Sequence, residues 1–265
     1  MKCYVINLDQ DTDRLEFMRN QFDALGLQFD RIPATDLRAE GARQRITPPP
    51  AKLLSNAEVG CFQSHIAAWQ RIIDSAAPYG CVFEDDVAIA TDAGQLLKST
   101  DWIPKGAGII KLETAFTQIE LGQRRSPATA RYETAVAQGN YGGGAAYILS
   151  RSACQRLLRE SRVIEEAVDL FLFSSRLSVQ SWQVVPAPCV QLLNLKKASY
   201  TVAGPDFSSN IAGTYTLDAR SRRSVWVRLR RRLSREVRRR LYSMAPTAVE
   251  FAFTGWTAGR SQDLT

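Results

Sequence analysis

Near the N-terminus, the spacing of apolar residues changes from strand-like to helix-like and back. Residues 3–8 form a short apolar run rich in β-branched and aromatic side chains, which predicts a core strand. Asp11 or Thr12 can then cap a helix that ends at Gly26. Its apolar positions follow helical spacing: Leu15, Met18, Phe22 and Leu25. Residues 28–32 favour a second strand, and this β-α-β order predicts a parallel sheet covered by helices.

A second helix and several strands follow. Ser55-Asn-Ala-Glu58 matches a capping box, in which the serine and glutamate satisfy each other's free backbone amides. The helix that begins there carries one apolar stripe: Val59, Phe62, Ile66, Trp69 and Ile73. Later patterns predict strands near 108–112, 132–137, 145–149 and 182–185, and helices around 152–158 and 168–177. The chain therefore has the pattern of an α/β fold.

Three consecutive carboxylates, Glu84, Asp85 and Asp86, stand where the apolar run from Cys81 would end as a strand. Neighbouring carboxylates repel, and burying one without a partner is costly. Strand periodicity places Glu84 and Asp86 on one side and Asp85 on the other. Ligands of α/β sheets bind beyond the carboxyl ends of the strands, and two oxygen ligands there suit Mg²⁺ or Mn²⁺ with substrate phosphates. The alternative is that these carboxylates cap a following helix or are merely solvated.

Several segments occur in an order and spacing that resemble a known family. They read YVINLDQDTDR from Tyr4, AEVGCFQSHIAAWQ from Ala57, CVFEDDV from Cys81, GGGAAYILSRSACQRLL from Gly142, VDLFL from Val168 and VVPAPCVQ from Val184. Together they resemble glycosyltransferase family 25, which includes bacterial lipooligosaccharide galactosyltransferases and the related collagen galactosyltransferases. The resemblance covers roughly residues 3–200 and leaves the C-terminal residues outside.

The resemblance implies a GT-A-like fold, with a mixed, mainly parallel sheet flanked by helices. It also implies a UDP-sugar donor, usually UDP-galactose, a divalent metal, and inversion at the anomeric carbon to give a β-linkage. The acceptor would be an oligosaccharide or glycolipid of lipopolysaccharide or lipooligosaccharide assembly. On this sequence, Glu84 and Asp86 would bind Mn²⁺ or Mg²⁺ at the diphosphate, with Asp85 nearby on the donor. The metal would offset charge on the departing UDP as a Lewis acid.

Further donor contacts are expected after the first strand and at a glycine run. Asn7 could contact the uridine and Arg14 a phosphate, whereas helix capping by nearby aspartates and a surface ion pair for Arg14 are the alternatives. Residues 142–144 allow close approach of the backbone to a sugar, although a simple turn fits equally well. The donor-binding candidates are Asn7, Leu8, Asp9, Arg14, Ser64, Asp85 and Gly143.

An inverting transfer needs one general base to deprotonate the acceptor hydroxyl. Asp169 is an isolated carboxylate in an apolar segment and matches the downstream aspartate of the family. An N-cap role for the following helix is its alternative. Glu113 is the next catalytic candidate, with Glu165 and Glu166 as competitors.

His65 is the only histidine in the chain and is also a catalytic candidate, because the Ser-His pair of the family places it near the site. A lone histidine on a buried helix is, however, more often a hydrogen-bonded core residue. A single histidine excludes a histidine-rich metal cluster, so we expect any bound metal to have oxygen ligands.

Charge divides the chain into two parts. The net charge of +7 conceals a strongly basic segment, because residues 220–244 contain eleven arginines and a single glutamate. We therefore expect a GT-A-like domain over residues 1–205, followed by a linker and an arginine-rich tail over 206–265. On a helical wheel the apolar residues of the tail gather opposite most arginines, which predicts a basic amphipathic helix on an anionic membrane surface.

Location and an alternative function follow from composition. Five scattered cysteines without a Cys-x-x-Cys pair suit a reducing cytosol, and neither a signal peptide nor an apolar span of about 20 residues is present. The sequence thus predicts a cytoplasmic protein, peripheral on the inner face of the bacterial cytoplasmic membrane. The alternative is an inactive GT-A-like module that binds anionic lipid or nucleic acid through the tail, although no nucleic-acid-binding motif supports specific nucleic-acid binding.

Overall fold

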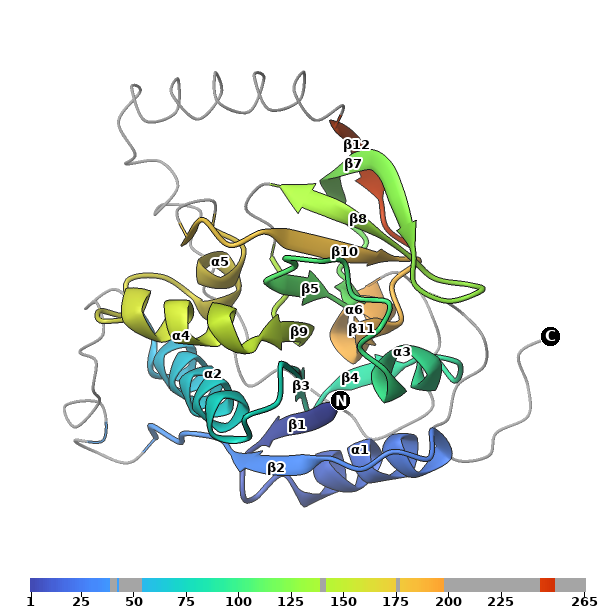
Figure 1. The fold of residues 1–265 in the computed structure, drawn as a ribbon. Helices are drawn as coiled ribbons and strands as arrows, with labels where there is room; N and C mark the ends of the chain where they lie inside the picture. Colours follow the sequence, from blue (N-terminus) through green and yellow to red (C-terminus); the bar gives the residue numbers. More distant parts are fainter. Residues whose placement is uncertain (39–41, 43–53, 139–141, 175–176, 198–243, 251–265) are drawn as a thin grey trace.

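The computed structural model describes residues 1–38, 42, 54–138, 142–174, 177–197 and 244–250 (Figure 1). Its first half contains β1 (Lys2–Asn7), α1 (Thr12–Ala24), β2 (Asp30–Pro33), α2 (Asn56–Asp74), β3 (Tyr79–Glu84), β4 (Val87–Ile89), α3 (Gly94–Lys98), β5 (Ile109–Lys111), β6 (Glu113–Thr114) and β7 (Gln118–Pro127). Its second half contains β8 (Glu133–Gln138), β9 (Ala146–Ser150), α4 (Arg151–Glu160), α5 (Val168–Leu172), β10 (Ser181–Val185), β11 (Cys189–Gln191), α6 (Leu192–Lys197) and β12 (Met244–Ala248).

A large mixed sheet forms the centre of the described chain. Its strand order is β12-β7-β8-β10-β5-β9-β3-β1-β2. The pairings of β1 with β2 and β3, and of β5 with β10, are parallel. Strands β1, β2, β3, β5, β7 and β10 run in one direction, and β8, β9 and β12 run in the other. The predicted α/β class, with a mixed and mainly parallel sheet, is therefore confirmed.

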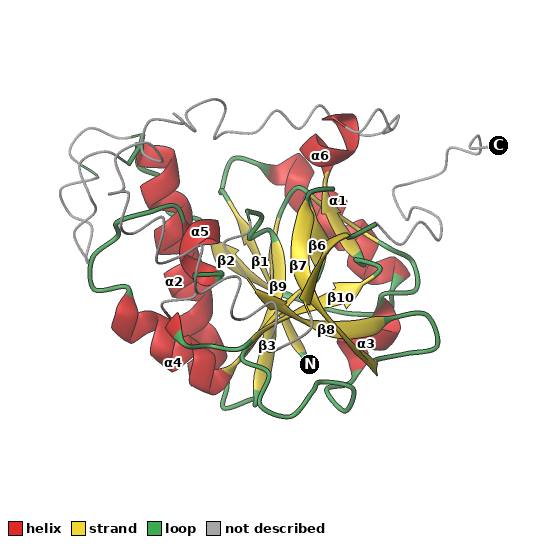
Figure 2. Ribbon diagram, turned by 90° about the horizontal axis from the view of Figure 1, so that it is seen from above, coloured by secondary structure: helices red, strands yellow, loops and turns green. Residues whose placement is uncertain are grey.

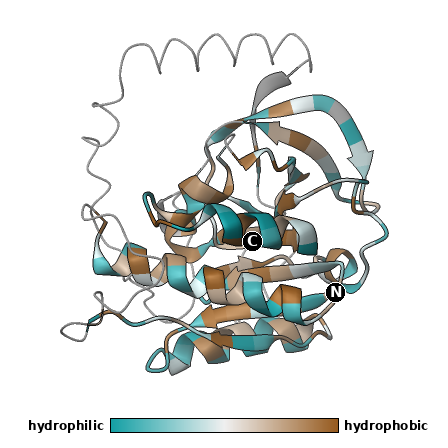
Figure 3. Ribbon diagram, turned by 60° about the vertical axis from the view of Figure 1, so that its left-hand side comes forward, coloured by the Kyte–Doolittle hydropathy of each residue, from teal (hydrophilic) through white to brown (hydrophobic). Residues whose placement is uncertain are grey.

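Helices cover both faces of this sheet. Viewed from above, α2, α4 and α5 lie on one side of the strands, and α1, α3 and α6 lie on the other (Figure 2). Strand β1 shows how two cores arise, because Tyr4 and Ile6 enter the cluster beneath α2 whereas Cys3 and Val5 enter the cluster beneath α1. Alternate side chains of a strand point to opposite faces, so a strand covered on both faces is apolar throughout. The apolar residues accordingly concentrate inside the layers (Figure 3).

Local signals correctly predicted most of these elements. Ser55 caps α2, its side chain accepts a hydrogen bond from the Glu58 amide, and Glu58 reciprocates at the Ser55 amide, as the capping box predicts. The helix predicted over 168–177 is shorter, because α5 ends at Leu172. Strand β7, which is polar and irregular, was not predicted. The short strands β4, β6 and β11 were not predicted either, since runs of two or three residues have no readable periodicity.

A small second sheet carries the segment after the acidic triplet. Its strand order is β4-β11-β6, with β11 antiparallel to β4 and parallel to β6. Only two residues, Asp85 and Asp86, separate the end of β3 from the start of β4, so they form the connection between the two sheets. The Leu192 amide donates to the Asp86 carbonyl, which fastens this connection to the end of β11.

Part of the segment that the sequence assigns to the tail belongs to the central sheet. Strand β12 pairs antiparallel with β7, Val249 is buried, and the Thr114 hydroxyl donates to the Val249 carbonyl. Residues 225–241, for which the basic amphipathic helix is predicted, lie outside the described residues, so its membrane contact stays a prediction. None of the described helices has the length and apolar character that crossing a bilayer requires.

The capping box gives a stability test. Replacing Ser55 with alanine removes the acceptor of the Glu58 amide, and we expect the free energy of unfolding to fall by about 1 kcal/mol, within the range of about 0.5–2 kcal/mol for lost caps. Urea denaturation followed by circular dichroism measures the change. Ser55→Thr keeps the hydroxyl, which accepts from the Glu58 amide and donates to the Glu58 carboxylate, and serves as the control. Equal losses in both variants would show that the cap does not account for the effect.

Candidate functional site

The acidic triplet lies where two neighbouring parallel strands end. Glu84 is the last residue of β3 and pairs in register with Ile6 of β1, so that Asn7, the last residue of β1, lies beside the triplet. Carboxyl ends of parallel strands meet at one edge of a sheet, where α/β proteins bind ligands. The topology therefore gathers polar residues from β1, β3 and the β3–β4 connection at one edge.

Asp85 points toward the N-terminal β-α unit. Its Oδ2 accepts a hydrogen bond of 2.7 Å from Asn7 Nδ2, and its Oδ1 lies 2.9 Å from Arg14 NH1 of α1. Burial raises the pKa of Asp85, although the bonds from Asn7 and Arg14 act in the opposite direction. Both oxygens of Asp85 are thus committed to protein partners, and Arg14 balances its charge.

Glu84 and Asp86 share a different neighbour. Gln191 Nε2, at the end of β11, lies 3.2 Å from Glu84 Oε2 and 3.4 Å from Asp86 Oδ1. These two carboxylates therefore converge on one amide, away from the partners of Asp85, as strand alternation predicts. Among the described residues, neither carboxylate forms a salt bridge with an arginine or lysine.

The pKa values of both carboxyl groups are raised. Burial, with a smaller contribution from Glu113, raises the pKa of Glu84 to about 8. Burial, and then the charge of Glu84, raises the pKa of Asp86 to about 7. A nearby cation would favour the charged form of both groups. The pair has two oxygen-donor groups and a deficit of positive charge, which fits a hard divalent cation such as Mn²⁺ or Mg²⁺.

Glu113 and Lys111 form an ion pair beside Gly143. Glu113 Oε1 accepts bonds of 2.6 Å from the Ala145 amide and 3.2 Å from Lys111 Nζ. Lys111 Nζ also donates to the carbonyls of Gly142 and Gly143. Gly143 has a φ of +91°, and a Cβ there would lie 2.7 Å from Lys111 Nζ. Only glycine fits this position without displacing the lysine.

Asp169 lies on the other side of this glycine segment. Its Oδ2 accepts a hydrogen bond of 3.2 Å from the Gly143 amide, and its Oδ1 accepts one of 2.8 Å from Leu170. The N-cap of α5 is Ala167, which places Asp169 inside the first turn, so the N-cap alternative for Asp169 is wrong. Asp169 and Glu113 also act electrostatically on both His65 and Glu84. The two base candidates are therefore near enough to His65 and Glu84 for their charges to act on both.

Glu113 has an unfilled acceptor. Its side chain is fully buried, and Oε2 has no hydrogen-bond partner, nor does Oε1 of the neighbouring Gln183. Both residues line a small hollow together with Lys111, Thr114 and Gly142. A single water has two hydrogens and can satisfy two such acceptors, whereas a hydroxyl group can donate to only one of them.

His65 is fully buried on α2. Its Nδ1 lies 2.6 Å from the Tyr147 hydroxyl, and its Nε2 lies 3.3 Å from Glu84 Oε1. Burial lowers the pKa of His65 to about 4, so the ring is neutral at physiological pH. Cys61, one turn earlier, offers its Sγ 3.9 Å from the same Glu84 oxygen. Ligand atoms of Cys61, His65 and Glu84 all lie within 4.8 Å of one another, a grouping that the sequence did not reveal.

The remaining donor-binding candidates lie at the edge of the site or beneath it. Ser64 is buried, its hydroxyl donates to the Gly60 carbonyl, and it accepts a bond from the Thr35 amide, so it joins α2 to the segment after β2. The Leu8 carbonyl accepts a bond from the Asp11 amide in the turn before α1. Asp9 is exposed and pairs with Arg31.

Two site residues had weak sequence signals that went unused. Lys111 is a charged residue inside the apolar run from Gly108 to Leu112, which is unusual unless the charge has a partner. Gln191 ends the apolar segment from Val184, and a polar residue at a strand end is a candidate for the ligand edge. Tyr147 had no such signal, because a tyrosine in an apolar strand is ordinary core.

Comparison with known proteins identifies the family of this chain. The sequence model of glycosyltransferase family 25 (LPS biosynthesis protein) matches residues 1–172. The lacto-N-neotetraose biosynthesis glycosyltransferase LgtE of Neisseria gonorrhoeae is 30% identical over 216 residues, which cover 74% of this chain and 76% of LgtE. LgtB of the same organism is 29% identical over 221 residues, which cover 74% of this chain and 76% of LgtB.

A third relative comes from another genus. The lipooligosaccharide biosynthesis protein lic2B of Haemophilus influenzae is 27% identical over 204 residues, covering 71% of this chain and 75% of lic2B. The matched residues 1–172 contain the acidic triplet, His65, Glu113 and Asp169. With the family match extending over well more than half of its length, this chain belongs to glycosyltransferase family 25.

Proposed function

We propose that this protein transfers a hexose, galactose in the first instance, from a UDP-sugar to a saccharide acceptor in lipopolysaccharide or lipooligosaccharide assembly. Membership of glycosyltransferase family 25 supports the transferase activity. The names of the Neisseria and Haemophilus relatives support the lipooligosaccharide pathway. The observation that carries the proposal is the convergence of Glu84 and Asp86 on Gln191 without a basic partner.

A nucleotide diphosphate is the substrate group proposed to bind beside Glu84 and Asp86, together with a divalent cation. Two carboxylates alone repel a diphosphate, and a divalent cation between them removes this repulsion. When bound, the cation would supply Lewis-acid stabilisation of the charge that develops on the departing UDP. Glu84 and Asp86 would hold it, and Gln191 would keep the two carboxylates converged.

The N-terminal β-α unit is proposed to bind the nucleoside. Asn7 and Arg14 both contact Asp85, so the three side chains act as one unit beside the carboxylate pair. Arg31 donates to Asn7 Oδ1 and thereby fixes the amide orientation. Since protein contacts already use most hydrogen-bonding groups of Asn7 and Asp85, these two residues are proposed to orient the β-α unit, and the exposed Asp9 is proposed to contact the donor.

Asp169 is proposed as the general base for an inverting transfer. Backbone amides of Gly143 and Leu170 orient its carboxylate, and its electrostatic effect reaches Glu84 and His65. Glu113 is the weaker candidate, because it is fully buried and its Oε1 already accepts from Ala145 and Lys111. A base must approach the acceptor hydroxyl within hydrogen-bonding distance, which favours the more accessible carboxylate.

The cation proposal is tested by Asp86→Asn, which preserves shape but removes one charge. We expect hexose transfer with Mn²⁺ to fall at least about 100-fold, since the cation accounts for several kcal/mol of transition-state stabilisation. The melting temperature should hold or rise, because a buried like charge is removed. Asp92→Asn, outside the site, is the matched control. Undiminished transfer by Asp86→Asn, or by the unmodified protein in excess EDTA, would refute the proposal.

The base proposal is tested by Asp169→Asn. General-base catalysis contributes about 10²–10⁴-fold, so kcat should fall by that factor while the Kd of the UDP-sugar, measured by calorimetry, changes little. Glu113→Gln is the parallel variant and should retain more turnover than Asp169→Asn. If Asp169→Asn keeps more than about a tenth of the original kcat, the loss is too small for a base and Glu113 takes its place.

A further inference from the structure

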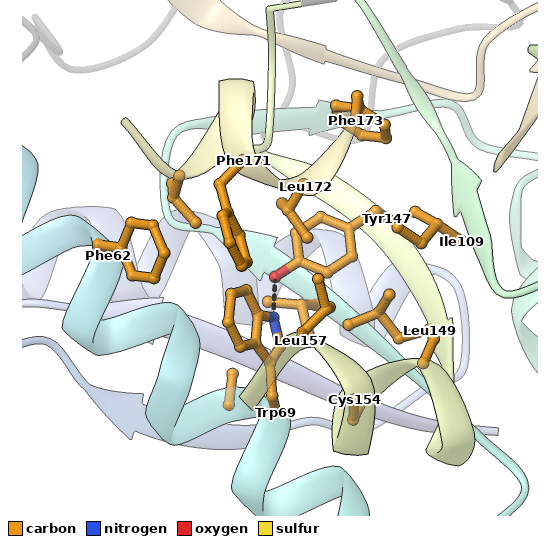
Figure 4. Packing of buried hydrophobic residues seen from close by; sticks show 14 of the residues in the cluster. Phe62, Trp69, Ile109, Tyr147, Leu149, Cys154, Leu157, Phe171, Leu172 and Phe173 are labelled. Carbon is orange, nitrogen blue, oxygen red and sulfur yellow. Dashed lines mark hydrogen bonds between the residues drawn. The ribbon is translucent and has the colours of Figure 1, made fainter. Parts of the chain in front are cut away.

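A chain of hydrogen bonds runs from the core beneath α2 to the acidic pair. Trp69 Nε1 lies 2.9 Å from the Tyr147 hydroxyl, a contact visible in Figure 4. The same hydroxyl lies 2.6 Å from His65 Nδ1, and His65 Nε2 lies 3.3 Å from Glu84 Oε1. The chain thus joins α2, β9 and the end of β3, and it finishes on a carboxylate proposed to bind the cation.

The hydrogens shared by Trp69, Tyr147 and His65 have one arrangement that gives every donor an acceptor. The indole N–H of Trp69 can only donate, so the Tyr147 oxygen accepts from it. The phenol hydrogen must then go to His65 Nδ1, because the described residues offer Tyr147 no other acceptor. His65 consequently carries its own hydrogen on Nε2 and donates it to Glu84.

The opposite tautomer leaves a donor without a partner. A hydrogen on His65 Nδ1 would make the Tyr147 oxygen accept twice, and the phenol hydrogen would have no acceptor. Trp69, His65 and Tyr147 are all fully buried, so water cannot supply the missing bond. Unsatisfied buried donors are costly and rare in folded proteins.

We propose that Trp69, Tyr147 and His65 act as a positioning relay, in which neutral His65 donates through Nε2–H to Glu84 and holds its carboxylate toward the cation. The part that concerns the cation rests on the proposed function. Gln191 donates to the other Glu84 oxygen, so the carboxylate is held from both sides. His65 is therefore a positioning residue, and its side chain is not the general base.

Packing against other aromatic rings holds the side chains of the relay in place. The His65 ring stacks on Tyr147 with a centroid distance of 5.7 Å and an interplanar angle of 21°. Trp69 stacks on Phe171 of α5 at 6.1 Å and meets the edge of Phe62 at 5.9 Å. Figure 4 shows Phe62 and Phe171 near the Trp69–Tyr147 bond. Rings packed in a buried core keep their rotamers, which is what orienting a carboxylate requires.

A soft-metal site is the rival use of the same groups. Cys61, His65 and Glu84 lie close enough to ligate an ion such as Zn²⁺, which favours sulfur and imidazole. Ligation through Nε2 would, however, force the hydrogen of His65 onto Nδ1. The phenol hydrogen of Tyr147 would then have no acceptor. The hydrogen-bond chain therefore favours a relay over a ligand role for His65.

The tautomer can be observed directly, because His65 is the only histidine of the chain. Nitrogen-15 NMR of the full-length, histidine-labelled protein should show one protonated nitrogen at Nε2 and one bare nitrogen at Nδ1 at neutral pH. Addition of Zn²⁺ should leave this pattern unchanged. A hydrogen on Nδ1, an average of both tautomers, or loss of the Nε2 hydrogen on adding Zn²⁺ would overturn the relay. This measurement involves neither catalysis nor Mn²⁺.

The effect on the cation is measured with Tyr147→Phe, which keeps the ring and removes the hydroxyl. The affinity for Mn²⁺ in the presence of UDP should fall about 10–100-fold, as is usual for residues that orient a ligand. Tyr132→Phe removes another buried hydroxyl, bonded to Asp92, and should leave Mn²⁺ affinity unchanged. Circular dichroism shows whether each variant is folded.

The outcomes separate the relay from the proposed function. Unchanged Mn²⁺ affinity in a folded Tyr147→Phe protein would overturn the positioning role. If the unmodified protein binds no Mn²⁺ with UDP, the cation part of the proposed function fails, and the tautomer of His65 alone decides the relay.

Discussion

Repulsion between closely placed carboxylates is the constraint on which the arrangement of this site depends. Asp85 is balanced by Arg14, and Glu113 is balanced by Lys111. Glu84 and Asp86 form no ion pair with an arginine or lysine among the described residues, and burial followed by neighbouring carboxylate charges raises the pKa of Glu84 to about 8 and that of Asp86 to about 7. Because these values are raised, the protein without a cation loses stability as the pH rises from the ordinary carboxyl range toward 8. A charge deficit kept at a ligand edge points to a cationic ligand.

The fold serves this constraint by distributing the polar groups over many elements. Strands β1 and β3 bring Asn7 and Glu84 to one edge, β11 brings Gln191, and α2 brings His65. Both oxygens of Asp85 and both oxygens of Glu84 therefore meet partners from different parts of the chain, which fixes the orientation of these two carboxylates. The lack of a side chain at Gly143 allows Lys111 and Glu113 to lie against its backbone, and the amide of the same residue donates to Asp169.

Sequence reasoning was reliable where the signal was local. The cap at Ser55, the strand that ends at Glu84 and the division of the triplet into two sides follow from spacing within a few residues. Gln191 contacts Glu84 across 107 residues of sequence, and Tyr147 contacts His65 across 82. Such pairings depend on strand order, which the pattern of apolar residues does not determine. Strand β12 was assigned to the tail for the same reason, because its partner β7 is distant in the chain.

The central claim, that Glu84 and Asp86 bind a divalent cation together with the diphosphate, is tested most directly by titrating UDP into the unmodified protein in a calorimeter. With Mn²⁺ present, the account predicts saturable binding of one UDP per chain, and without Mn²⁺ it predicts binding at least about tenfold weaker, since each tenfold in Kd corresponds to about 1.4 kcal/mol of lost charge compensation. Equal affinity for UDP with Mn²⁺ and with excess EDTA would contradict it.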